Sequence, residues 1–147
     1  TVFRRMAKEK GIDLHEFHRL AERIHDFDRI IDSMSIEEGK RGNVVVDAHL
    51  AGWVLRDIAD LKIYFTAPLE VRARRISERD GKPYEEALRE ILEREKSNAK
   101  RYMEIYGIDI RDLSVFDLVI NTDLWTIDYI AKMLVEAVRS MRRREDK

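Results

Sequence analysis

Cysteine is absent from the 147 residues, which excludes disulfide scaffolds, iron–sulfur clusters, thiolate zinc sites and cysteine nucleophiles. Glutamine is also absent, and asparagine occurs only at Asn43, Asn98 and Asn121. No apolar run approaches the ~18 residues of a membrane span, and no signal-peptide pattern opens the sequence. We therefore expect a cytoplasmic protein that does not interact with a membrane.

Positive and negative charges are nearly balanced in the sequence. Lysine and arginine number 28 and aspartate and glutamate 29, which gives a formal net charge of −1. This balance argues against a nucleic acid as the main partner. Charged residues make up 39% of the chain, and many charges combined with few thermolabile amides are typical of hyperthermophile proteins. The hydrophobic fraction of 44% is enough for one globular domain over residues 1–147.

Strands that alternate with helices predict an α/β fold with a parallel sheet. The β-branched run at residues 43–47 is typical of a strand buried on both faces, and residues 61–65 and 116–121 predict two more strands. Three strands leave such a sheet incomplete, because a buried parallel strand needs a neighbour on each side. The first three predicted helices are residues 2–10, one from Asp13, and one that has Ile30, Ile31 and Met34 inward and ends around Gly39 and Gly42. The others are residues 68–80, residues 84–106 and one from near Thr126.

Asp47 falls at the carboxyl end of the first predicted strand, with His49 and Gly52 in the loop that follows. Ligands of open α/β sheets bind outside the carboxyl ends of strands, and an acid there often holds a metal ion or its waters. The alternative is an aspartate that caps the following turn.

Three arginines, Arg72, Arg75 and Arg79, share one face of the predicted helix 68–80. Guanidinium groups are the preferred clamp for phosphate oxygens, and stacked like charges cost stability without an anion. The alternative is a solvated face neutralised by Glu70 and Glu78.

A second polar face consists of Arg94, Asn98 and Arg101 on the predicted helix 84–106. Two arginines with an amide between them could grip a phosphate and contact a base or sugar, although a salt-laced helix surface is the alternative. Arg4 follows Phe3, so that a guanidinium and an aromatic ring could meet one ligand. An acid at a strand end with three arginine sets together predicts a crevice that handles phosphate.

The sequence resembles the archaeal type of cytidylate kinase along essentially its whole length. That family consists of P-loop nucleoside monophosphate kinases, which transfer the γ-phosphate of ATP to CMP or dCMP with Mg²⁺. The resemblance implies a three-layer α/β fold around a parallel sheet. The segments that carry it are Val2–Ala7, Gly42–Trp53, Ala67–Ile76, Glu93–Tyr102, Ile105–Asp109 and Asp117–Thr122.

The resemblance also implies roles for these residues. Arg4 contacts the acceptor phosphate, and the loop with Asp47, His49 and Gly52 lies beside both substrates. Asp47 holds Mg²⁺, directly or through water. Residues 14–38 match the mobile acceptor-binding insert.

For the remaining candidates the resemblance implies two groups. Arg94, Asn98 and Arg101 surround the cytosine and phosphate of CMP. The others lie where the lid region, residues 72–100, begins or at the end of the last predicted strand and just after it, and they stabilise the transferring phosphoryl group or bind ATP. These residues are Arg72, Arg75, Arg79, Asn121 and Thr122.

The sequence departs from the family pattern in three places. Ala48-His49 replaces the usual Gly-Arg, and Asn98 replaces a frequent acid, which leaves the preference for CMP over UMP open. No Gly-x-x-x-x-Gly-Lys-Ser/Thr motif occurs. By the resemblance, a central strand, the phosphate-binding loop and the first helix are therefore lacking, and we expect the chain by itself not to be a competent kinase.

Two other functions stay open at this point. One is a non-catalytic, truncated module that binds nucleotides or a protein partner. The other is a kinase for another small acceptor such as AMP, UMP or shikimate. We expect a monomer or a weak homodimer.

Overall fold

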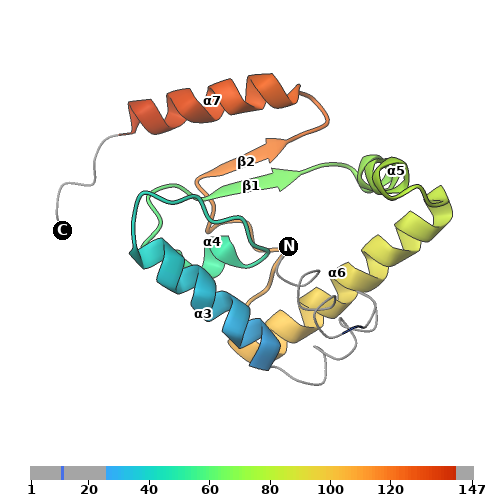
Figure 1. Cartoon of the computed structure of the whole chain (residues 1–147), viewed down its shortest axis with the longest axis horizontal. Coiled ribbons are helices and arrows are strands. Elements are labelled where there is room, and N and C mark those ends of the chain that lie inside the picture. The colour runs from blue at the N-terminus through green and yellow to red at the C-terminus, as the bar shows by residue number, and fades with distance from the viewer. Residues whose placement is uncertain (1–10, 12–25, 142–147) are drawn as a thin grey trace. The chain divides into compact units, whose positions relative to one another are not determined.

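The computed structural model describes residue 11 and residues 26–141. The two helices expected before residue 26, the candidate Arg4 and residues 14–25 of the expected insert lie outside the described residues. The elements are α3 (Asp26–Lys40), α4 (Ala51–Val54), β1 (Ile63–Thr66), α5 (Leu69–Asp80), α6 (Tyr84–Tyr106), β2 (Leu118–Asn121) and α7 (Ile127–Ser140) (Figure 1).

The two strands form a parallel pair, which confirms an α/β fold with a parallel sheet. Ile63 pairs with Leu118 and Thr66 with Asn121, so both strands end at the same edge. Helices α5 and α6 form the connection between them in the sequence, as parallel strands require. At the opposite edge, the Lys62 ammonium lies 2.9 Å from the Asp117 carboxylate and ties the starts of the two strands together.

Local signals set the helix ends where the sequence predicts them. Pro68 precedes α5, and Gly81 ends it in the left-handed conformation at φ 65°. Helix α6 spans the predicted residues and stops before Gly107, also left-handed at φ 66°. At the start of α7 the Thr126 hydroxyl accepts a hydrogen bond from the Tyr129 backbone amide at 3.3 Å.

The prediction of a buried strand at residues 43–47 is wrong. The backbone from Val44 to Ala48 is irregular, and Val45 is 98% exposed. A β-strand exists only as a partner in a hydrogen-bonded ladder, and within the described residues β1 and β2 pair solely with each other. A β-branched run favours the extended conformation but supplies no partner for it.

The predicted inner face of α3 is also wrong at Ile30 and Met34, which are both about half exposed. Among the side chains of this helix that the structure describes, the buried ones are Asp28, Asp32 and Ser35, spaced i, i+4 and i+7 on one face. Polar groups inside a protein need partners, so α3 packs by hydrogen bonds as well as by apolar contact.

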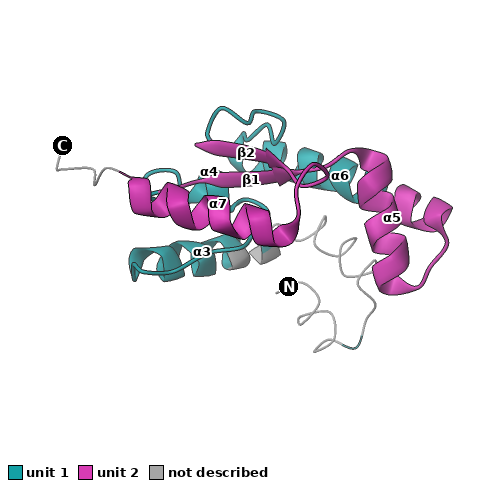
Figure 2. Cartoon of the chain, turned by 90° about the horizontal axis from the view of Figure 1, so that it is seen from above, with its two compact units in different colours: residues 1–60, 92–115 teal, residues 61–91, 116–147 magenta. Residues whose placement is uncertain are grey.

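The described chain forms two compact units (Figure 2). Unit 1 comprises residues 1–60 and 92–115, and its core includes Leu50, Trp53 and Leu55. Gly39 lets α3 approach this core, since a Cβ there would lie 3.0 Å from a Leu55 methyl group.

Unit 2 comprises residues 61–91 and 116–147 and contains β1, β2, α5, α7 and the first part of α6. Its buried apolar residues include Ala73, Ala87, Ile91 and Ile130. Ile127 at the start of α7 is exposed. Of the helices in the described ranges, none has the length and apolarity needed to cross a bilayer.

Candidate functional site

Unit 1 contains a cluster of basic side chains around the loop before α4. Desolvation, and then the positive charges of Arg94 and Arg101, lower the pKa of His49 below its ordinary value, and Asp47 opposes this shift. His49 nevertheless keeps an exposed surface. Gly52 lies in α4, three residues further on. The structure thus brings His49 close to the arginines of α6, and a phosphate is the kind of ligand that such a charge cluster suits.

The polar face of α6 is divided between water and the interior. Arg94 is exposed, whereas Asn98 and Arg101 are buried, with 3% and 1% of their surfaces accessible. The Arg101 guanidinium donates to Asp28 Oδ2 at 2.8 Å, to Asn98 Oδ1 at 3.0 Å and to Ser97 Oγ at 2.7 Å. Spacing predicts that Arg94, Asn98 and Arg101 share a face, but not that two of them point inward.

Two acids of α3 complete this network, and sequence reasoning missed both. Asp28 holds Arg101, and Asp32 accepts a hydrogen bond from the Tyr106 hydroxyl at 2.5 Å. Burial raises the pKa of Asp32, the hydrogen bond from Tyr106 opposes the shift, and the charge of Asp28 adds to it. The i, i+4 spacing of the two acids was the signal available in the sequence, because it places them together on the helix.

Unit 2 contains a second group of candidates at the carboxyl edge of the sheet. Arg75 of α5 donates to the Thr122 hydroxyl at 2.8 Å and to the Thr122 carbonyl at 2.9 Å. The Thr122 hydroxyl in turn donates to the Thr66 carbonyl at 3.1 Å. Asn121 accepts a hydrogen bond from the Asp123 backbone amide at 3.0 Å, which shapes the turn after β2. The structure therefore joins three predicted residues, Arg75, Asn121 and Thr122, at the edge where ligands of parallel sheets bind.

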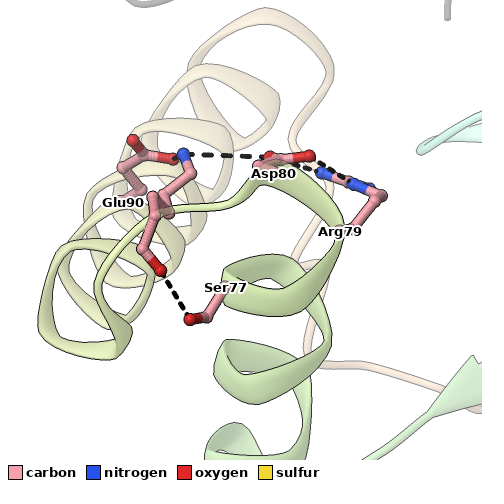
Figure 3. Close-up of polar contacts among 5 residues, drawn as sticks. Ser77, Arg79, Asp80 and Glu90 are labelled. Atoms are coloured by element: carbon pink, nitrogen blue, oxygen red, sulfur yellow. Dashed lines mark hydrogen bonds and ion pairs between the residues drawn. The ribbon is translucent and has the colours of Figure 1, made fainter.

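The other two candidate arginines of α5, Arg72 and Arg79, have separate partners. Arg72 donates through Nε to the Ala67 carbonyl at 3.0 Å. Arg79 pairs with the neighbouring Asp80, with its Nε 2.6 Å from a carboxylate oxygen (Figure 3). The three arginines that share a face of α5 thus contact three different residues of unit 2, and these contacts do not bring their guanidinium groups together.

The turn between α5 and α6 is fastened by polar contacts. Lys82 donates to Glu90 at 2.6 Å and lies 3.8 Å from Asp80, and its carbonyl accepts a hydrogen bond from the Ser77 hydroxyl at 2.6 Å (Figure 3). These contacts brace the beginning of the segment that the resemblance assigns to a lid.

The donor set for a metal ion is sparse. Within residue 11 and residues 26–141, no three histidine or carboxylate side chains are grouped to hold an ion. Asp47 offers one exposed carboxylate. Mg²⁺ is commonly bound by one or two carboxylates with water and substrate phosphates, so Asp47 fits a shared site of that kind.

The candidates thus fall into one group per unit. Unit 1 contains the loop and α6 candidates, and unit 2 contains those of α5 and of the turn after β2. The members of unit 1 are Asp47, His49, Gly52, Arg94, Asn98 and Arg101, and those of unit 2 are Arg72, Arg75, Arg79, Asn121 and Thr122. That both groups serve one crevice stays a prediction.

Comparison with known proteins identifies the family. Residues 1–124 match the profile described as the cytidylate kinase-like family. A cytidylate kinase of Pyrobaculum islandicum is 51% identical over 142 residues, which covers 91% of this chain and 77% of that protein. The cytidylate kinase of Pyrococcus horikoshii is 48% identical over 137 residues, covering 93% and 71%, and that of Ignicoccus hospitalis is 48% identical over 139 residues, covering 92% and 81%. The chain therefore belongs to the cytidylate kinase-like family.

Proposed function

We propose that this chain is a cytidylate kinase polypeptide, which takes part in transfer of the ATP γ-phosphate to CMP or dCMP. The observation that carries the proposal is the basic cluster of unit 1, where the exposed Arg94 lies on the same face of α6 as Arg101 and both arginines lower the pKa of His49. A nucleotide phosphate supplies a negative partner for Arg94 and His49, since Arg101 is already paired with Asp28. Family membership selects a nucleoside monophosphate as the ligand.

On this proposal unit 1 binds the acceptor. Arg94 is exposed and reaches the phosphate, while His49 approaches it from the loop before α4. His49 binds the phosphate more strongly when it is protonated, since only the imidazolium is a cation. Asp47 is the residue that would hold Mg²⁺ together with phosphate oxygens and water.

Unit 2 binds ATP and stabilises the phosphoryl group that is transferred. Arg75 is fixed against Thr122 at the carboxyl edge of β1 and β2, and this contact sets the turn that would lie against ATP. Arg72 and Arg79 begin the lid, where guanidinium groups stabilise the charge that is spread over the transferring phosphoryl oxygens. The finer fold that we propose is the three-layer arrangement of P-loop nucleoside monophosphate kinases.

The reaction consists of one displacement. A phosphate oxygen of CMP attacks the γ-phosphorus of ATP, the bond to the β,γ-bridging oxygen breaks, and ADP and CDP result. Mg²⁺, when bound, neutralises phosphate charge. The residues of this chain position the acceptor and balance the charge that moves from one nucleotide to the other.

Calorimetric titration of the 147-residue chain with CMP tests the proposal, with AMP and UMP as competing acceptors. Binding is the appropriate measurement because the acceptor candidates are present, whereas the Gly-x-x-x-x-Gly-Lys-Ser/Thr motif is not among these residues. We expect selective binding of CMP. Preference for AMP or UMP would indicate a kinase for another acceptor, and no binding by a folded chain would favour a module without this site.

A pair of arginine variants localises the binding. Arg94→Gln removes a charge-assisted contact to phosphate, and we expect CMP to bind roughly 10–100-fold more weakly. Arg56→Gln is the matched control, since Arg56 is also an exposed arginine of unit 1 and pairs only loosely with Asp57 at 3.7 Å. Equal affinities of the two variants would refute the assignment of Arg94.

A further inference from the structure

The guanidinium group of Arg101 is engaged on all of its nitrogens by the chain itself. Nε donates to Asp28 Oδ2 at 2.8 Å, and Nη2 lies 3.4 Å from Oδ1 of the same carboxylate. Nη2 also donates to Asn98 Oδ1 at 3.0 Å, and Nη1 donates to Ser97 Oγ at 2.7 Å. Because Arg101 is also buried, a nucleotide phosphate could reach it only if these bonds were broken.

Arg94 is a different kind of arginine. It lies two helical turns before Arg101 on the same face of α6, and it is exposed. Within the part of the chain that the structure describes, its guanidinium group forms no hydrogen bond or ion pair. Donors that face water are available to a phosphate without the loss of an internal contact. The acceptor phosphate is therefore better served by Arg94 than by Arg101.

The partner of Arg101 belongs to α3, and a second bond joins the same two helices. Asp28 and Asp32 lie one turn apart on α3, where Asp28 holds Arg101 and Asp32 accepts from Tyr106. Both helical segments belong to unit 1. Most of α3 falls within residues 14–38, the segment that the family resemblance assigns to acceptor binding. The two bonds thus fix this part of the segment against the helix that carries Arg94.

We propose that Asp28 and Arg101 are a positioning pair for the acceptor nucleotide. Asp28 holds Arg101, and this pair fastens α3 to α6 and orients the Asn98 side chain of α6. Arg94 is the arginine that contacts the phosphate. This inference rests on the proposed function and assigns Arg101 a role through other residues, instead of direct contact with CMP. Asp28 becomes a determinant of acceptor binding although it has no substrate contact of its own.

The test compares CMP with cytidine, which lacks the phosphate, in calorimetric titrations of four variants. For Asp28→Asn we expect both ligands to bind roughly tenfold more weakly, with their affinity ratio unchanged. Ser97→Ala removes one bond of Arg101 and is the milder variant; we expect a smaller loss that is again equal for both ligands. Arg94→Gln should weaken CMP alone, and Glu136→Gln, an exposed change on α7, should alter neither affinity.

Ionic strength gives a second measure of phosphate contact, because salt screens exposed charges. Arg94→Gln should flatten the salt dependence of CMP binding, whereas Asp28→Asn and Ser97→Ala should retain it. Circular dichroism establishes which variants are folded under the titration conditions. If Asp28→Asn does not fold, the equal loss in Ser97→Ala decides the question.

Three results would overturn the inference. Wild-type affinities in folded Asp28→Asn and Ser97→Ala would mean that the pair is purely structural. Tighter CMP binding by Asp28→Asn, or a loss restricted to CMP in Ser97→Ala, would mean that Arg101 is a direct phosphate ligand and that Asp28 competes for it. A folded wild-type chain that binds neither ligand would instead refute the proposed acceptor site, and the inference would fall with it.

Discussion

Replacement of Asp28 by asparagine should strongly destabilise unit 1. The ion pair with Arg101 is sheltered from water, since the two side chains are 3% and 2% exposed. Solvent therefore screens little of the interaction, and the guanidinium left behind cannot be hydrated without rearrangement. Removal of one partner of such a buried pair costs about 3–5 kcal/mol of the free energy of unfolding.

Denaturant unfolding followed by circular dichroism measures this loss. Glu136→Gln is the matched control, because its ion pair with Arg139 is open to water, with side chains 69% and 72% exposed. An exposed pair contributes about 0–1 kcal/mol, so the control should unfold close to the wild type. A loss in Asp28→Asn no larger than in the control would refute the reasoning.

A double replacement separates the value of the pair from the cost of an orphaned charge. In Asp28→Leu/Arg101→Met both charges are removed together, and buried pairs replaced in this way are often neutral or more stable. We expect the double variant to recover most of the stability that Asp28→Asn loses. A double variant as unstable as Asp28→Asn would show that the hydrogen bonds of Arg101 to Ser97 and Asn98, and not the balance of charge, dominate.

Three further variants test other features of the structure. Burial raises the pKa of Asp32 above 3.8, so the folded protein binds this proton more tightly than the unfolded chain, and the free energy of unfolding falls as the pH rises from 3.8 through the raised pKa. Asp32→Asn should remove this fall, measured by urea unfolding at several pH values in that range. A pH profile of Asp32→Asn that matches the wild type would contradict the prediction. Gly81→Ala should cost about 1 kcal/mol by urea unfolding, because φ is 65° although nothing lies within 4 Å of an added Cβ; no loss would argue against the left-handed turn. Thr126→Ala should cost about 1 kcal/mol, measured in the same way, through the hydrogen bond to the Tyr129 amide; a neutral change would mean that the cap contributes nothing.

The parts of the fold that the sequence predicts well depend on local signals. Helix α5 follows Pro68 and ends at Gly81, and α6 ends at Gly107, because these residues fix or permit backbone angles regardless of distant contacts. The two observed strands were also predictable, since each is an apolar run bounded by polar residues. These elements place Arg75 and Thr122 near the same sheet edge before any contact is known.

The wrong strand at residues 43–47 shows where local signals end. Val44, Val45 and Val46 favour an extended backbone in any protein, but a strand needs a ladder partner from a distant part of the sequence. Extended preference and strand formation are therefore separate conditions. In the described chain these three valines have the preference for an extended backbone, but they do not form a strand.

The same distinction explains why the sequence does not reveal which polar residues of α6 are buried. Helical spacing correctly puts Arg94 and Arg101 on one face, yet their roles depend on what packs against each turn. Arg101 pairs with Asp28 of α3 and is buried, whereas Arg94 forms no such ion pair with the residues that the structure describes and stays exposed. The chain is 39% charged, and one of its ion pairs, between Arg101 and Asp28, is buried. The desolvation cost of such pairs falls with temperature, which makes a charged interior less costly for a protein that works hot.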